Sequence, residues 1–226
     1  MSTQSSAAHE SETRIVVRPL GNPLPLGFLA LMVATTAVAM LQLGVLQPDQ
    51  GHVVALGLLV LTVPLQTIAC VLGFLARDPV AGTGMGVLAG TWAAVGFTML
   101  GSAPGVTSPA LGVLLLGSAV AMTVPTAAAT TKLAGLAVLG CSSVRFAITG
   151  IGQLTGSPAW LTAAGWVGVV LALVAAYAAL AFELEDVRHT TVLPIGRRGA
   201  GASTMTAPAR DELAPVAHEA GVRQEL

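Results

Sequence analysis

The sequence contains few charged and few aromatic residues. Of its 226 residues only 9% are Asp, Glu, Lys or Arg and 4% are Phe, Trp or Tyr, whereas 54% are hydrophobic. Soluble domains carry roughly a quarter charged residues, so this composition excludes an ordinary water-soluble globular protein. The formal net charge of −1 offers no basic surface to a polyanion, and we expect no nucleic-acid partner.

Side chains that carry out chemistry are also scarce. The two cysteines, Cys70 and Cys141, both lie within apolar runs, and we interpret them as small packing residues rather than as a disulfide or a metal pair. No group of His, Cys, Asp and Glu has the spacing of metal ligands, and no pair of carboxylates falls within an apolar run. The sequence therefore predicts no enzyme, no metal site and no cofactor.

Long apolar runs dominate what is present. Six of them reach the length of about 20 residues that a helix needs to cross a bilayer. The runs are continuous and do not alternate in polarity, which excludes the strands of a membrane barrel. We predict an all-α integral membrane protein that passes six times through the cell membrane, an inner or plasma membrane, with helices over Leu24–Leu46, His52–Ala76, Ala81–Gly101, Pro109–Thr130, Leu133–Gly152 and Trp160–Leu184.

The two ends of the chain are polar. Residues 1–21 and 197–226 lack an apolar period and are predicted to be disordered tails on a transmembrane domain of residues 22–196. With six spans, nine of the ten Lys and Arg residues lie on one side of the membrane. Basic residues accumulate on the cytoplasmic side, so we predict that both tails are cytoplasmic.

Three short motifs lie at the two borders and in the last span of this domain. They are Asn22-Pro23-Leu24-Pro25-Leu26-Gly27, Gly165-Trp166-Val167-Gly168 and Thr191-Val192-Leu193-Pro194-Ile195-Gly196. Prolines suit the first turn of a helix, and Asn22 is a candidate N-cap, so the first motif has a purely structural interpretation. In order and composition the three motifs resemble those of the acetate uptake transporter family, of the succinate–acetate permease type.

That resemblance implies a function and an assembly. Relatives are hexamers of six-helix subunits that pass small monocarboxylates such as acetate, and also succinate, either with protons as symporters or as anion channels. It also implies that the segment Asn22–Gly27, with Pro23, Pro25 and Leu26, shapes the cytoplasmic entrance of the pathway. In relatives a ring of Phe, Tyr and Leu narrows the pathway, and those positions correspond here to Leu31, Ala89 and Ser142.

The sequence departs from the family at this ring, because none of the three side chains is retained. Ala89 and Ser142 would make it wider and more polar. Two alternatives to carboxylate transport therefore stay open. In the first alternative, the chain forms a non-transporting membrane assembly or sensor of the same fold. In the second, it forms a channel for another small solute, including a neutral one.

Polar side chains inside the apolar runs are further candidates, because burying them costs free energy unless they have partners. Gln66 either forms an interhelical hydrogen bond or lines the pathway, and Thr149 and Gln153 could donate to a carboxylate. Arg145 lies 13 residues beyond Lys132 in the sequence, about 20 Å along a helix, and so past the membrane midplane. It either reaches the outer headgroups or helix-end carbonyls, or it faces the pathway as a fixed positive charge that attracts carboxylates.

Small and helix-breaking residues complete the expectations. Gly82, Gly86 and Gly90 repeat at a spacing of four, which favours close packing of helices either within one subunit or between subunits. Pro64 and Pro125 fall inside the second and fourth spans, where each is expected to kink its helix.

Overall fold

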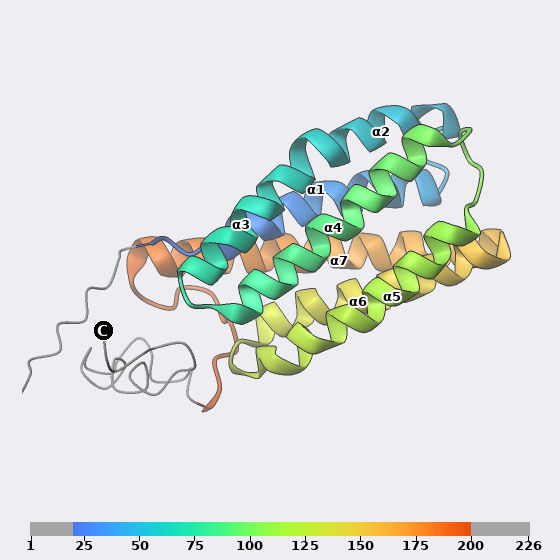
Figure 1. Cartoon of the computed structure of the whole chain (residues 1–226). Helices are drawn as coiled ribbons and strands as arrows, with labels where there is room; N and C mark the ends of the chain where they lie inside the picture. Colours follow the sequence, from blue (N-terminus) through green and yellow to red (C-terminus); the bar gives the residue numbers. More distant parts are fainter. Residues whose placement is uncertain (1–19, 200–226) are drawn as a thin grey trace, which may run out of the picture.

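The computed structural model describes residues 20–199, which form a bundle of long helices (Figure 1). These residues contain no β-strand, and six helical stretches among them are long and apolar enough to cross a membrane. The predicted all-α fold with six membrane-spanning helices is therefore confirmed. The predicted disordered tails lie almost wholly outside the described residues.

Five of the six spans are single helices and the second is composite. The single helices are α1 (Leu24–Gln42), α4 (Pro79–Gly101), α5 (Pro109–Ala128), α6 (Leu133–Thr155) and α7 (Pro158–Arg188), with the 3-10 turn η3 (Ala129–Thr131) after α5. The second span joins the 3-10 turn η1 (Pro48–Gln50), α2 (Gly51–Gly57), the π-helical turn η2 (Leu58–Thr62) and α3 (Val63–Leu75). The predicted boundaries agree with these to within four residues.

The first span ends earlier than predicted because the chain turns at Gly44. This glycine has a φ of +72°, in the left-handed region that side chains other than glycine rarely adopt. The apolar residues Val45 and Leu46 extend the hydropathic run without extending α1. Hydropathy alone therefore placed the end of this span too late.

Pro64 is accommodated by the π-helical turn η2 directly before it. The N–H of Val63 bonds to the carbonyl of Leu58, five residues earlier, so the extra residue in the turn absorbs the bond that proline cannot form. The hydroxyl of Thr62, buried in this turn, donates to the carbonyl of Ala30 on α1 at 3.3 Å. The irregular turn is thus tied to the first span.

The helices pair in a few long contacts. α1 packs along α7, α5 along α6 and α3 along α4, and α6 also contacts α7 (Figure 1). Both described ends of the chain lie at one end of the bundle. We call this the terminal end (residues 20–23, 76–79, 129–133 and 189–199) and the other the loop end (residues 43–51, 102–108 and 156–157).

The spaced glycines of α4 pack mainly within the chain. A Cβ atom on Gly82 would lie 2.8 Å from the ring of Phe74, and one on Gly86 would lie 3.1 Å from the Cys70 sulfur. Gly90 is exposed and has open space beside it. The first two glycines therefore serve the contact of α4 with α3, whereas Gly90 leaves a small notch on the outer face.

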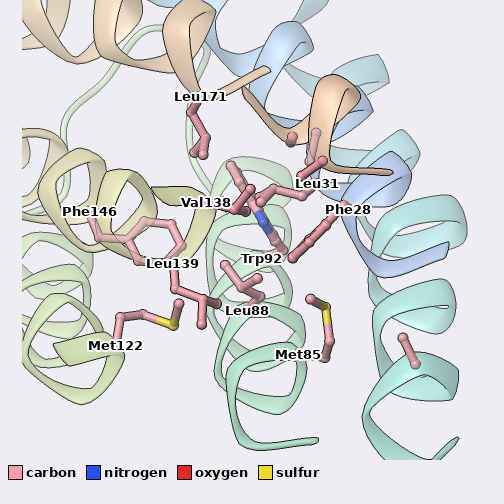
Figure 2. Packing of buried hydrophobic residues seen from close by; sticks show 14 of the residues in the cluster. Phe28, Leu31, Met85, Leu88, Trp92, Met122, Val138, Leu139, Phe146 and Leu171 are labelled. Atoms are coloured by element: carbon pink, nitrogen blue, oxygen red, sulfur yellow. The ribbon is translucent and has the colours of Figure 1, made fainter. Parts of the chain in front are cut away.

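Large side chains from α1, α4, α5, α6 and α7 fill the centre of the bundle (Figure 2). The ring of Trp92 meets that of Phe146 edge-on, with centroids 5.9 Å apart. Phe28 of α1 packs against Phe182 of α7 at 6.1 Å. These aromatic pairs tie α4 to α6 and α1 to α7.

The last motif, Thr191–Gly196, folds back across the terminal end. Backbone bonds join Gly196 and Ile195 to the start of α6, and Ile195 is buried. Glu185 forms an ion pair with Arg197 and accepts a hydrogen bond from Thr191 at 2.9 Å. The motif therefore clamps the end of α7 to the turn between α5 and α6.

Candidate substrate pathway

A cavity of about 340 Å³ lies at the loop end, between α1, α4, α5, α6 and α7. Most of its wall is apolar, with Leu41, Val95 and Leu111 among the lining residues. Among the lining residues, Arg145 of α6 carries the one charged side chain. We call this cavity at the loop end the outer cavity.

The guanidinium of Arg145 is buried, with 1% of the residue exposed. Its Nη1 donates to the carbonyl of Thr35 at 3.0 Å and its Nη2 donates to Oε1 of Gln42 at 3.4 Å, both on α1. Its central carbon lies 5.6 Å from the centroid of the Trp92 ring, a cation–π distance. The structure therefore does not place this charge at the headgroups but holds it inside the bundle beside the cavity.

Gly168 of α7 makes room for this charge. A Cβ atom there would lie 2.6 Å from Nη1 and 2.7 Å from Cζ of Arg145, closer than real Cβ contacts come. The glycine belongs to the Gly-Trp-Val-Gly motif, and a larger residue at this place would displace the guanidinium. The close approach of α7 to Arg145 thus depends on the absence of a side chain.

Thr149 and Gln153, two further predicted pathway residues, line the same cavity on the next two turns of α6. The Thr149 hydroxyl donates to the carbonyl of Arg145 at 2.8 Å. Oε1 of Gln153 accepts from the N–H of Ser108 at 2.8 Å, which leaves its amide NH2 as a donor for a ligand. The structure brings the three predicted polar residues of α6 together on one wall.

A smaller cavity of about 70 Å³ lies at the terminal end. Lys132 lines it, with its Nζ 3.7 Å from the carboxylate of Asp78 and 5.7 Å from the ring of Phe182. The ion pair is about one-third exposed, so we expect it to contribute little to stability. Each cavity therefore carries one basic side chain.

A buried layer separates the two cavities, which share no lining residue. On α4, Met85 lines the terminal-end cavity and Trp92 the outer one, about 10 Å apart along the helix. Leu88, which lies between them in sequence, is fully buried (Figure 2). Two of the three predicted constriction positions, Leu31 on α1 and Ser142 on α6, are also fully buried and fall between cavity-lining residues of their own helices.

The predicted third member of the ring, Ala89, is 6% exposed and lies next to Leu88 in sequence. Leu88 belongs to the central cluster of Figure 2, and Ser142 uses its hydroxyl on the carbonyl of Val138 at 2.8 Å. Sequence reasoning overlooked Leu88, because an apolar residue in an apolar run carries no signal. Leu88 fills space that the small Ala89 does not.

The first motif adjoins the terminal-end cavity. Oδ1 of Asn22 accepts from the N–H of Leu24 at 3.1 Å, and its backbone N–H donates to Asp186 at 3.3 Å. The helix thus begins one residue later than an Asn22 N-cap would give, with Pro23 in the N-cap position.

The rest of the motif contacts the neighbouring helix α4 and the cavity. Pro23, Pro25 and Gly27 are buried, and Leu26 is half-buried. A Cβ atom on Gly27 would overlap the sulfur of Met85. Leu24, inside the motif, lines the cavity, whereas Asn22 is not among its lining residues.

Gln66 lies apart from both cavities. Its side chain is fully buried, and Nε2 donates to the carbonyl of Gly27 at 3.4 Å. Its Oε1 has no hydrogen-bond partner within the described part of the chain. The geometry gives Gln66 the interhelical hydrogen bond that we considered, and it lines neither cavity.

Gln42 and Lys132 are the polar site residues that sequence reasoning missed. Gln42 is the last residue of α1, where a polar residue is expected simply because the span ends there. Lys132 directly precedes α6. The feature of the sequence that could have indicated them is their position, because each lies near an end of a predicted span.

Comparisons with known proteins agree with this architecture. A sequence model of the GPR1/FUN34/yaaH family matches residues 6–195. Two solved chains match the structure, and one, described as the structure of the bacterial acetate channel SatP, has 24% sequence identity and a TM-score of 0.70. That match covers 79% of this chain and 100% of the other. No curated protein matches.

Proposed function

We propose that this chain, which belongs to the GPR1/FUN34/yaaH family, passes small monocarboxylates through a membrane, with acetate as the first substrate. The family is one of membrane transporters and channels, so the chain is not an enzyme. Family and structural neighbour together indicate a channel or transporter for acetate. Acetate is an anion, and the single observation that carries the proposal is the buried Arg145 beside the outer cavity.

The pathway runs from the outer cavity to the terminal-end cavity in this proposal. An anion leaves water among apolar walls, meets Arg145, crosses the layer of Leu31, Leu88 and Ser142, and reaches Lys132. Because the layer is packed, the anion passes only when side chains there move. The proposed location is the inner or plasma membrane of the cell, with the terminal end of the bundle facing the cytoplasm. The segment Asn22–Gly27 then lies at the cytoplasmic entrance of the pathway.

Assembly and coupling are also part of the proposal. We expect a hexamer, as the family resemblance implies. In the second span, Pro48–Leu75, only 28% of the most apolar 18-residue segment is buried within one chain. The exposed remainder is a surface that other chains or lipid would cover. Native mass spectrometry of the purified protein measures the number of subunits. Uptake with and without an imposed pH gradient separates proton symport from an anion channel.

Uptake of labelled acetate into proteoliposomes tests the function. We expect uptake above that of protein-free vesicles, and Ala89→Tyr should reduce uptake of solutes larger than acetate because it thickens the central layer. Val120→Tyr, at a position on α5 that is 70% exposed and lines neither cavity, is the matched control and should behave as the parent. Assembled protein that takes up no acetate would overturn the proposal and favour a non-transporting assembly, whereas uptake of neutral solutes alone would favour the other alternative.

A further inference from the structure

The outer cavity is larger than acetate requires. Its volume is about 340 Å³, at the lower end of the range for small-ligand pockets. The four non-hydrogen atoms of acetate need at most about 120 Å³, if each takes the roughly 30 Å³ that a water molecule occupies in the liquid. About two-thirds of the cavity would remain beside a bound acetate.

The cavity carries a single charge, and that charge is buried. Among the residues that line it, Arg145 is the sole charged side chain. Its two hydrogen bonds to Thr35 and Gln42 account for two of the five N–H donors of a guanidinium. No acidic side chain forms an ion pair with it in the described chain, so a carboxylate would supply the missing counter-charge.

A second buried donor lies at the same place. Nε1 of Trp92 is buried and has no hydrogen-bond partner among residues 20–199, and Trp92 lines the cavity beside the guanidinium. Buried polar groups in proteins nearly always have partners, so an orphan N–H next to an unpaired cation is unusual. A small anion on Arg145 is the kind of ligand that could satisfy it after a modest shift of the ring.

The remaining wall is suited to hydrocarbon. The apolar side chains that line the cavity include Leu41, Val95, Met99, Val106 and Leu111. An apolar tail that replaces water against such a wall gains about 0.8 kcal/mol per methylene, which is about fourfold in affinity. A second carboxylate at the far end of a ligand would meet no cation among the lining residues.

We propose that the outer cavity is a binding site for monocarboxylates that carry an apolar tail of about five carbons, with the carboxylate on Arg145 and the tail along the wall of Met99 and Leu111. The inference rests on the proposed function in that it takes the same cavity as part of an anion pathway. It differs from that function in the ligand, because acetate fills the site poorly and a dicarboxylate leaves one charge without a cation.

Binding by the full-length protein in nanodiscs, measured by titration calorimetry with empty nanodiscs subtracted, tests the inference. We expect hexanoate to bind at least tenfold more tightly than acetate, with butyrate between them. Adipate has the same chain length as hexanoate and a second carboxylate, and it should bind at least tenfold more weakly than hexanoate. Equal affinities for acetate and hexanoate, or for hexanoate and adipate, would overturn the inference.

Two variants locate the site. Arg145→Leu should weaken hexanoate binding at least tenfold, and Arg145→Lys should restore part of it, since Lys keeps the charge without the planar fork. Val106→Trp fills the outer part of the cavity from an exposed position and should weaken hexanoate while sparing acetate. If Arg145→Leu fails to assemble, Val106→Trp still decides, because unchanged hexanoate binding there would place the tail elsewhere and overturn the inference.

The two proposals fail in different ways. Acetate uptake by proteoliposomes without any preference for longer carboxylates in binding would overturn the inference alone. Tight hexanoate binding by a protein that takes up no acetate would overturn the transport function alone.

Discussion

Gly168 has no side chain, and this leaves the space that the guanidinium of Arg145 occupies. Its Cα is close enough to Arg145 that a methyl group would overlap Nη1 and Cζ. The guanidinium also has fixed acceptors on α1, so it has little room to retreat. Four helices therefore position the charge: α6 carries it, α1 supplies two acceptors, α4 supplies the ring of Trp92, and α7 leaves the space at Gly168.

Gly168→Ala should consequently disturb the site more than the fold. We expect it to reduce anion uptake severalfold and to lower stability by about 1–3 kcal/mol, the usual cost of overpacking. The measurements are proteoliposome uptake and thermal unfolding of the purified protein. Gly90→Ala is the control, since a Cβ atom there meets nothing within 4 Å. Equal uptake by the two variants would show that the guanidinium tolerates displacement.

Asn22 separates two roles at the terminal end, the capping of α1 and the attraction of an anion. Its side chain caps an otherwise open N–H of the first turn, and the N-terminal end of α1 carries a partial positive charge. Asn22→Ala should cost about 1 kcal/mol of stability through the lost cap and should reduce uptake. Asn22→Asp keeps the cap and adds a negative charge, so it should retain stability and still reduce anion uptake. Full uptake by Asn22→Asp would mean that this residue has a structural role alone.

At the scale of helices, α3 and α4 approach each other through backbone atoms. A Cβ atom on Gly73 would lie 2.7 Å from the amide nitrogen of Gly82 and 3.0 Å from its Cα. Backbone cannot move aside as a flexible side chain can, so this contact sets the distance between the two helices near the terminal end. The terminal-end cavity lies beside it, with Ala81 and Met85 of α4 in its lining.

Gly73→Ala should force α3 and α4 apart and lower the unfolding temperature of the protein. The expected loss of stability is about 1–3 kcal/mol, as for other overpacked sites. Gly57→Ala places the same methyl group in open space on the same span and should be neutral or slightly stabilising. If both variants unfolded at the parent temperature, the close contact of the backbones would not limit the packing of α3 on α4.

At the scale of the whole molecule, an even number of spans places both tails on the same side of the membrane. The described ends of the chain agree with this, because they share one end of the bundle (Figure 1). The basic residues Arg77, Lys132 and Arg188 lie at that end as well. By the positive-inside rule we propose that this end faces the cytoplasm.

Cysteine labelling of intact cells tests the orientation. In a background with Cys70 and Cys141 replaced by Ala, Asp49→Cys at the loop end should react with a membrane-impermeant maleimide added outside. Thr190→Cys at the terminal end should react only after the cells are opened, and both positions are exposed in the structure. The reverse pattern of labelling would invert the proposed orientation.

The sequence by itself determined the number, order and approximate ends of the membrane spans. Hydropathy adds up over about 20 neighbouring residues, so it is a local property that needs no knowledge of packing. For the same reason it failed at local breaks: Gly44 ends α1 inside an apolar run, and a π-helical turn directly precedes Pro64. Arg145 was also visible in the sequence, because a lone charge in an apolar run is costly wherever the helix packs.

Only the tertiary structure decided what surrounds that charge. Thr35, Gln42 and Gly168 lie 110, 103 and 23 residues from Arg145 in the sequence, and nothing local to any of them points to the others. The contacts of α1 with α7 and of α6 with α7 bring the four together, and they leave Gln66 outside both cavities. The side chains that meet across helices depend on how small residues let the helices approach, which is a property of pairs of helices and not of any single run.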